Sequence, residues 1–196
     1  MGTLGEGPRP EERELVVLVD EAGRAIGTAP KAEVHHEATP LHRAFSLFLF
    51  DERGRTLLQR RSRAKRTWPG VWSNSCCGHP MPGEESEEAA RRRLREELGL
   101  AEEGLETMLP GFRYRAEEGG VVENELCPVL VARPVGLPAP DPEEVMELQW
   151  VDWVALLARV RERPESLSPW CREEALLLDR EPRFHRWLQA RLRTDH

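Results

Sequence analysis

The chain has 196 residues, of which 39% are hydrophobic and 32% charged, a composition typical of a folded domain rather than of a disordered or fibrous protein. Its formal net charge of -7 disfavours a general nucleic-acid binder. No apolar run approaches the roughly 20 residues that a membrane-spanning helix needs. We therefore expect neither nucleic acid nor a membrane as a partner.

Two further features indicate a reduced, cytoplasmic setting. The first 14 residues are rich in Gly, Pro and Glu and lack the apolar segment of a signal peptide, so residues 1–14 are expected to form a flexible tail. The cysteines do not have the spacing of a secreted disulfide framework. We therefore expect four free thiols, at Cys76, Cys77, Cys127 and Cys171.

Short apolar runs separated by turn residues predict a series of strands. The run at 44–50 indicates a buried strand, and after the turn at 51–54 the run at 56–61 is expected to return as its hairpin partner. Residues 71–77 are expected to be extended after the chain break at 68–70. Further strands are expected at 15–19, 112–115, 121–132 and 148–151.

One helix is predicted at 84–98. Ala90, Leu94 and Leu98 form a single apolar stripe, and Gly99 ends the pattern. Because this helix lies among strands, the pattern predicts one domain of the α/β (α+β) class.

The last part of the chain has a helical pattern. It begins at 152 and is interrupted by Pro164, Pro169 and Pro182. We expect the domain to span 15–180 and a helical C-terminal tail to occupy 181–196.

Basic residues gather between 53 and 66, and the residues that are rare in this chain add a second signal. A solvated loop would explain the charge run, and so would a site for a phosphorylated small molecule. The chain has only two lysines, two asparagines and one tyrosine, which suggests positions where Arg, Asp or Phe will not serve. These residues are Lys31, Lys65, Asn74, Asn124 and Tyr114.

The segment at 78–100 combines a glycine, carboxylates and an arginine at regular spacing. Gly78 precedes Glu84 by six positions, Arg92 follows eight positions later, and the segment ends with Glu96, Glu97, Gly99 and Leu100. A loop that leads into an acidic helix can hold a divalent cation against a diphosphate, because hard cations prefer oxygen ligands. The alternative is a solvated helix stabilised by ion pairs four residues apart.

This spacing resembles the Nudix box, with one departure. Where the hydrolase version has a glutamate after the arginine, this chain has Arg93, and a guanidinium cannot bind a cation. The change favours a relative that binds a diphosphate without cleaving it.

Longer motifs indicate which relative. The segment at 68–80 closely resembles the active-site segment of type I isopentenyl-diphosphate isomerases. Further segments resemble other signatures of that family, and the likeness extends over roughly 15–178; these segments are 31–46, 112–115, 122–128 and 168–170. The resemblance implies a Nudix-like mixed β-sheet sandwiched by helices. It also implies conversion of isopentenyl diphosphate to dimethylallyl diphosphate, with no flavin.

Alternation along extended segments indicates which side chains act together. Cys77 and His79 share one face and Cys76 points to the other, so Cys77 is the expected reactive thiol. Glu123 and Glu125 also share a face, and two such carboxylates repel each other unless a cation or a proton lies between them.

With three imidazoles, these carboxylates form a set suited to Mn²⁺, Zn²⁺ or Mg²⁺. The resemblance implies that the family's metal site comprises His35, His42, His79, Glu123 and Glu125. His36 is the alternative to His35 in register, and a structural role is the alternative for each histidine.

The resemblance also implies a second ion and a diphosphate site. Mg²⁺ would be carried on the bound diphosphate and held by Glu97 and the main chain of Cys77. The residues that match the family's diphosphate contacts are Lys31, Arg61, Lys65 and Arg93.

Moving a double bond requires an acid and a base on opposite sides of a dry pocket. We expect Glu125, assisted by Tyr114, on the protonation side. Cys77 would take the other proton as a thiolate favoured by nearby cations. The two roles can be exchanged without conflict with the sequence. Trp170, with Trp72 as second choice, would face the developing carbocation, and core packing is the alternative for both.

Two other functions are compatible with a Nudix-like fold. One is hydrolysis of a nucleoside or other small diphosphate, and the other is a non-catalytic module that binds phosphorylated ligands or a protein. The expected partner is a small-molecule diphosphate, and the expected assembly is a monomer or weak dimer.

Overall fold

The computed structural model describes residues 14–192. The expected tail at 1–13 and residues 193–196 lie outside the described residues. Among the described helices, none is both long and apolar enough to cross a membrane. In chain order the elements are β1 (Leu15–Val19), β2 (Ala25–Pro30), α2 (Lys31–Val34), β3 (His42–Arg43), β4 (Phe45–Leu49), β5 (Arg55–Arg61), β6 (Trp72–Ser73), β7 (Cys76–Gly78), α3 (Ser86–Leu98), β8 (Ala101–Leu109), β9 (Arg113–Glu118), β10 (Val121–Leu126), β11 (Val129–Val135), β12 (Val145–Asp152), α4 (Trp153–Glu162), η1 (Pro164–Ser166), α5 (Pro169–Leu178) and α6 (Pro182–Gln189).

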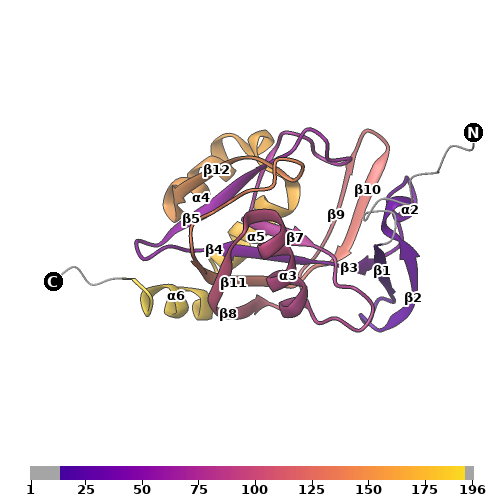
Figure 1. The fold of residues 1–196 in the computed structure, drawn as a ribbon, viewed down its shortest axis with the longest axis horizontal. Helices are drawn as coiled ribbons and strands as arrows, with labels where there is room; N and C mark the ends of the chain where they lie inside the picture. Colours follow the sequence, from indigo (N-terminus) through magenta and orange to yellow (C-terminus); the bar gives the residue numbers. More distant parts are fainter. Residues whose placement is uncertain (1–13, 193–196) are drawn as a thin grey trace, which may run out of the picture.

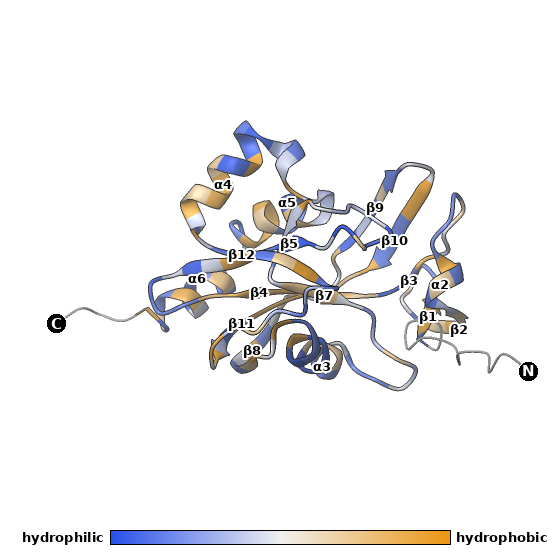
Figure 2. Cartoon of the chain, turned by 45° about the horizontal axis from the view of Figure 1, so that its top comes forward, coloured by the Kyte–Doolittle hydropathy of each residue, from blue (hydrophilic) through white to orange (hydrophobic). Residues whose placement is uncertain are grey.

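A four-stranded sheet in the order β7-β4-β11-β8 lies at the centre of the molecule, between α3 and the C-terminal helices (Figures 1 and 2). Five further strands form a second sheet in the order β2-β1-β3-β10-β9, and β12-β5-β6 form a third. The mixed architecture with helices on both sides confirms the predicted fold class.

Strand β4 separates two hydrophobic cores, since alternate side chains of a strand point to opposite faces. Phe45, Leu47 and Leu49 pack against α3. Phe48 and Phe50 pack on the other side. All five side chains are at most 1% exposed, so both faces of this sheet are closed to solvent.

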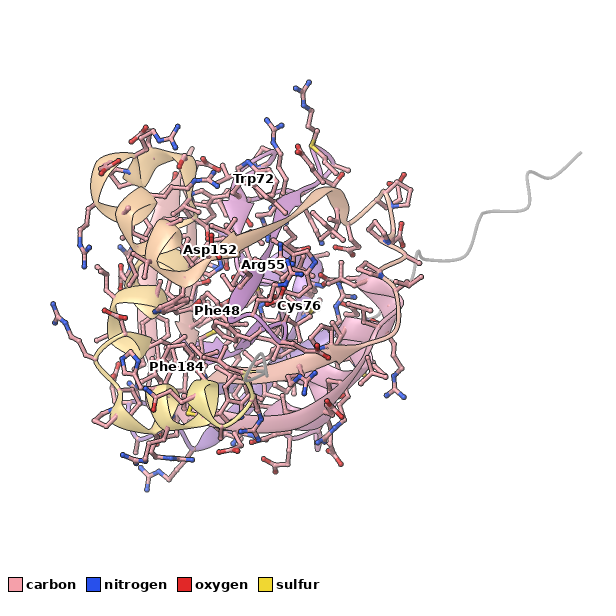
Figure 3. The ribbon with its side chains drawn as sticks, turned by 90° about the vertical axis from the view of Figure 1, so that its left-hand side faces the viewer. Phe48, Arg55, Trp72, Cys76, Asp152 and Phe184 are labelled. Carbon is pink, nitrogen blue, oxygen red and sulfur yellow. The ribbon has the colours of Figure 1, made fainter. Side chains whose placement is uncertain are left out.

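The second core is closed by α4, α5 and α6. Phe184 of α6 is fully buried and packs its ring 5.0 Å from Trp153 and 5.3 Å from Phe50, between ring centroids. Figure 3 labels Phe184 on this C-terminal helix and Phe48 in the sheet. A proline lies in the first turn of each of η1, α5 and α6, where its missing N–H costs no hydrogen bond.

Helix α3 was predicted from its apolar stripe, and Ala90, Leu94 and Leu98 are indeed fully buried. The helix begins at Ser86, two residues later than predicted, because Glu85 and Glu88 form a capping box there. Gly99 ends the helix in the left-handed conformation, with φ of 64°.

The predicted hairpin between 44–50 and 56–61 is wrong. Strand β4 pairs with β7 and β11, whereas β5 pairs with β12 and β6, and only the bridge between Phe50 and Thr56 joins the two. The strands diverge around Ser75, whose hydroxyl accepts from Leu49 N–H at 2.7 Å and donates to Leu57 O at 2.6 Å. That hydroxyl therefore satisfies backbone groups that a hairpin ladder would have paired.

The predicted strand at 121–132 is also two strands. Pro128 cannot donate to a ladder, and at this point the chain passes from β10 in the five-stranded sheet to β11 in the central sheet. Strands β2 and β8 were not predicted. Their side chains are mostly exposed or half-buried, so they carry little hydrophobic alternation.

Candidate active site

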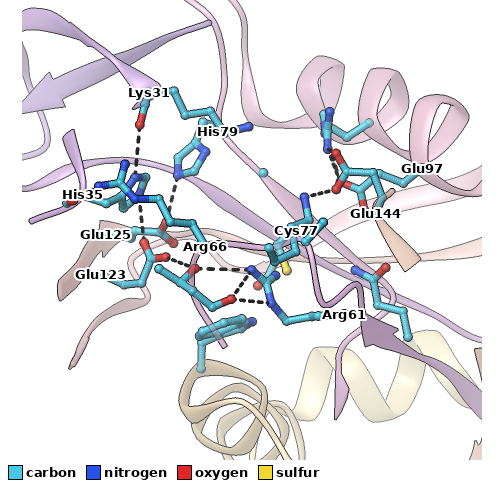
Figure 4. A pocket seen from close by; sticks show the side chains of 18 of the residues that line it. Lys31, His35, Arg61, Arg66, Cys77, His79, Glu97, Glu123, Glu125 and Glu144 are labelled. Atoms are coloured by element: carbon cyan, nitrogen blue, oxygen red, sulfur yellow. Dashed lines mark hydrogen bonds and ion pairs between the residues drawn. The ribbon is translucent and has the colours of Figure 1, made fainter. Parts of the chain in front are cut away.

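A cavity of about 370 Å³ opens where the central sheet meets the five-stranded sheet. Figure 4 shows its two ends: histidines and Glu123 and Glu125 lie at one, Glu97 and Glu144 with their cationic partners at the other, and Cys77 lies between. Every substrate-binding residue expected from the sequence lines this cavity, namely Lys31, Arg61, Lys65 and Arg93.

Strand pairing builds the histidine end. Glu125 on β10 lies directly opposite His42 on β3 in a parallel pair, and β10 places Tyr114 of β9 on its other side. His79 follows β7, and His35 follows the short helix α2. Four separate segments thus converge through the sheet rather than through a contiguous motif.

Four side chains at this end can hold a metal ion. One ligand atom from each of His35, His42, His79 and Glu125 lies within 4.8 Å of the others. Glu125 Oε1 is 3.0 Å from His79 Nε2 and 3.6 Å from His42 Nε2.

The ring orientations suit metal binding. The Nδ1 atom of His42 lies 2.9 Å from the Pro40 carbonyl, and that of His35 lies 3.4 Å from the Lys31 carbonyl. A carbonyl only accepts, so each Nδ1 is the donor and the neutral ring keeps its lone pair on Nε2. Both Nε2 atoms are buried and have no hydrogen bond within the described residues, as expected of metal ligands.

Glu123, the fifth expected ligand, lies beside this group. Its Oε2 is 3.0 Å from His35 Nε2, and its Oε1 accepts a hydrogen bond from Thr67 Oγ1 at 2.8 Å. The four-residue group therefore forms without Glu123, which contacts it through His35.

The charges of this group are strongly coupled. Burial lowers the pKa of His79 to about 4, although Glu125 opposes the shift. Burial acts in the same direction on His42, but Glu125 outweighs it and raises its pKa. Burial raises the pKa of Glu125, yet its contacts with both rings hold it well below the usual range. Glu125 is therefore ionised in this arrangement.

Ion pairs organise the cationic end. Lys31 pairs with Glu14 at 2.5 Å, and Arg93 of α3 donates to Glu97 at 2.5 Å and to Glu144 at 3.1 Å. Lys65 forms an ion pair with Glu144. Burial lowers the pKa of Lys65 to about 8.

Arg61 joins the cationic end to an aromatic wall. Its guanidinium lies 5.3 Å from the centroid of Trp170 and donates to the Thr67 carbonyl at 3.0 Å. The Tyr114 ring is 5.5 Å from the ring of Trp170. Trp72, the second-choice aromatic residue, does not line the cavity, because its ring packs against the core under Arg159.

The two adjacent cysteines point to opposite sides of β7. Cys77 lines the cavity, and its Sγ lies 3.3 Å from Asn74 Oδ1. Cys76 is fully buried under α3, with its Sγ 3.7 Å from Glu97 Oε2.

The expectation that local cations favour a Cys77 thiolate is wrong for this arrangement. Burial raises the pKa of Cys77 to about 12, and Arg61 offsets only part of that shift. The nearby carboxylates of Glu97, Glu125 and Glu174 add to the rise.

Comparisons with known proteins agree with this geometry. A NUDIX domain model matches residues 40–171. The isopentenyl-diphosphate Delta-isomerase of Mycolicibacterium vanbaalenii is 54% identical over 173 residues, covering 88% of this chain and 95% of that protein. The protein of the same name from Saccharopolyspora erythraea is 54% identical over 162 residues, covering 82% of this chain and 84% of that protein. The chain belongs to the isopentenyl-diphosphate Delta-isomerase family of Nudix-domain proteins.

A solved structure of lower sequence identity has a similar fold. The Deinococcus radiodurans protein DR0079 superposes with a TM-score of 0.67 at 23% identity, covering 84% of this chain and 98% of that chain. At this identity the likeness concerns the Nudix fold alone.

Membership of this family explains why the Nudix box has Arg93 in place of a glutamate. Gly78 lies so close to α3 that a Cβ atom there would be 3.1 Å from Arg93 Cγ, so the glycine lets the strand approach the helix. Glu84 accepts two hydrogen bonds of 2.8 Å from Arg92, which ties the loop to the helix. In this isomerase-family chain Arg93 thus adds a cation to the cavity where a hydrolase box has a carboxylate.

Sequence reasoning missed several residues at this site. Asn74 accepts from Trp170 Nε1 at 3.1 Å and from Cys77, so it connects the aromatic wall to the thiol. Asn74 carried a compositional signal as one of two asparagines. Glu144 and Glu174 carried none, because they are glutamates in an acidic chain with 35 Asp and Glu residues.

Proposed function

We propose that this protein converts isopentenyl diphosphate to dimethylallyl diphosphate by adding a proton at one carbon and removing a proton from another. The observation that carries the proposal is the position of Cys77, between a group of cations and a carboxylate–histidine group in one cavity. The relatives that are 54% identical bear the name of this isomerase.

The cations supply the means to hold the diphosphate. Lys31, Arg61, Lys65 and Arg93 all line the cavity. Guanidinium groups bind phosphate oxygens in pairs, and ammonium groups act as point charges. An anchored diphosphate would place the five-carbon chain along the wall that Trp170 and Tyr114 form, toward Cys77 and Glu125.

The residues present fit a divalent metal, because three imidazoles, two of them buried, and Glu125 offer ligand atoms within 4.8 Å of one another, and two of the Nε2 atoms have no hydrogen bond within the described residues. We propose that His35, His42, His79, Glu123 and Glu125 hold one ion, Mn²⁺, Zn²⁺ or Mg²⁺. Glu97 and the main chain of Cys77 would hold a Mg²⁺ ion carried on the diphosphate. Bound ions would supply positive charge that fixes Glu125 in place and neutralises the diphosphate.

Proton transfer falls to two groups on opposite sides of the bound chain. Glu125, with the Tyr114 hydroxyl beside it, would deliver a proton to the alkene; because it is ionised in this arrangement, it must gain that proton before the step. Cys77 would accept the proton from the neighbouring carbon. Because burial raises the pKa of Cys77 to about 12, the thiol must lose its own proton before the step, or Cys77 and Glu125 must exchange roles. The Trp170 ring would stabilise the carbocation between the two transfers through its electron-rich face.

A time course of proton and phosphorus NMR spectra in D₂O tests the proposal. The protein would receive isopentenyl diphosphate and Mg²⁺. Dimethylallyl diphosphate that contains deuterium, without phosphate release, is the expected result. Phosphate release without isomerisation would indicate a Nudix hydrolase instead, and no reaction by folded, metal-loaded protein would leave a binding module.

A further inference from the structure

Glu144 bridges two of the cations at the proposed diphosphate site. Its Oε1 accepts from Arg93 Nη2 at 3.1 Å, and its Oε2 forms the ion pair with Lys65. The side chain is 15% exposed and lines the cavity. The carboxylate therefore contacts the same N–H groups that phosphate oxygens would need.

The backbone of Glu144 fixes the carboxylate at this position. The Glu144 carbonyl accepts from Ser62 N–H at 2.9 Å, at the start of the loop that carries Lys65. The Glu144 N–H donates to Asp141 O at 3.0 Å, and Asp141 N–H donates to Glu97 O at 2.8 Å, at the end of α3. Glu144 is thus attached to both elements that supply its cationic partners.

The carboxylates at this end pair with the cations that a bound diphosphate would contact. Glu14 pairs with Lys31, Glu97 pairs with Arg93, and Glu144 bridges Arg93 and Lys65. Within residues 14–192, no carboxylate other than that of Glu144 lies within ion-pair distance of Lys65. An incoming anion that binds Lys65 therefore meets the charge of Glu144 and competes with it for the ammonium group.

We propose that Glu144 is a resident anion that makes the site selective for diphosphate over smaller anions. A diphosphate can contact Lys65 and Arg93 at once and so replaces both contacts of Glu144. Inorganic phosphate replaces fewer of them and leaves the carboxylate close by, where like charges repel. This inference rests on the proposed diphosphate site, and it adds the residue that determines the site's selectivity.

Isothermal titration calorimetry of the full chain with inorganic diphosphate and with inorganic phosphate, both in the presence of EDTA, tests the proposal. The variant E144Q keeps the shape of the side chain and removes its charge. We expect phosphate to bind about tenfold more tightly to E144Q and diphosphate about threefold more tightly, so that the preference for diphosphate falls. A thermal melt would show that the variant is folded.

Glu143 provides a matched control. It lines the same cavity, is exposed and precedes Glu144 in the chain, but its carboxylate forms no ion pair with the cations within the described part of the chain. E143Q makes the same change in net charge, so we expect both affinities to change less than about twofold. An equal effect of E143Q and E144Q would overturn the proposal, because bulk charge would then explain both.

A second variant distinguishes competition between Glu144 and the anion from positioning of the cations by Glu144. In K65M one of the two bridged cations is gone, so adding E144Q to K65M should tighten phosphate binding much less than in the wild type. Weaker binding of both anions by E144Q would contradict the proposal and indicate that Glu144 positions the cations. A wild-type chain that binds no diphosphate, either in EDTA or after Mg²⁺ is added, would instead remove the proposed site itself, whereas an unchanged preference in E144Q would remove only the role of Glu144.

Discussion

His42 and Glu125 are direct partners in the parallel pairing of β3 and β10, and His42 Nε2 lies 3.6 Å from Glu125 Oε1. The backbones that carry both side chains are held by sheet pairing rather than by a loop. His42 is fully buried and Glu125 is 6% exposed, so neither can turn to solvent. The fold thus prepares the site before any ligand arrives, which lowers the cost of ordering it.

The first prediction concerns the metal. H42N should lower the affinity for Mn²⁺ or Zn²⁺ by at least about tenfold, because it removes an Nε2 ligand whose tautomer the Pro40 carbonyl fixes. Metal content after dialysis would be measured by inductively coupled plasma mass spectrometry. Added metal should also raise the melting temperature of the wild type and not that of the variant.

His185 offers a control for this measurement. Its Nε2 lies 2.7 Å from the Asp179 carbonyl on the other side of the second core, and it takes no part in the four-residue group. H185N should bind metal like the wild type. Equal metal content in H42N and the wild type would refute the proposed ligand set.

The second prediction separates the two adjacent cysteines. C77A should lower kcat by about 10³-fold or more, since it removes one of two proton-transfer groups and leaves the cations intact. C76A should lower kcat far less but reduce stability by about 1–2 kcal/mol, because it opens a small space under α3. Steady-state kinetics and thermal melts would measure both. Comparable activity of C77A and the wild type would rule out Cys77 as the acid or base.

The local features of this fold could be read from the sequence, and the pairing of distant strands could not. Helix α3 was predicted from the stripe of Ala90, Leu94 and Leu98, since helical periodicity is a property of neighbouring residues. The hairpin of β4 and β5 was wrong because the pairing of β4 depends on β7 and β11, which lie far away in sequence. Sequence proximity cannot show that Ser75 hydrogen-bonds both diverging strands.

At the site, too, local features could be predicted from the sequence and features that depend on the folded environment could not. Alternation along a strand correctly separated Cys76 from Cys77, because that property is local. The resemblance to the isomerase family named residues that the cavity does bring together. The protonation of Cys77 was predicted wrongly, because cations near in sequence were weighed without burial, which raises the pKa of Cys77 to about 12.

The third prediction follows from Lys65, whose pKa burial lowers to about 8. The charged form exists below that value, so the affinity for diphosphate should fall as the pH rises through 8. K65R should keep its affinity to higher pH, because a guanidinium stays protonated throughout this range. Calorimetric Kd values for inorganic diphosphate between pH 6.5 and 9.5 would measure the difference. Parallel curves for the two proteins would show that Lys65 does not control binding.

The fourth prediction concerns Glu174 on α5, one helical turn after Trp170. Glu174 is fully buried, and within the described residues neither of its carboxylate oxygens has a hydrogen bond of good geometry. Burial raises its pKa to about 8, and the nearby charge of Glu125 adds to the rise, whereas the Ser46 hydroxyl opposes it. An uncompensated buried carboxylate costs so much that the group stays protonated at neutral pH.

Because the pKa of Glu174 is higher in the folded than in the unfolded chain, the folded state binds the proton more tightly. Stability should therefore fall as the pH rises from about 4.5 toward 8 and then level off. E174Q removes this dependence, so the wild type should lose about 2 kcal/mol relative to E174Q between pH 5.5 and 7.5. Urea unfolding at several pH values would measure it, with E173Q at the exposed neighbouring position as the control. If the curves of E174Q and the wild type run parallel, the carboxyl group of Glu174 is ionised in the folded protein, and its charge must then be balanced by a bound cation.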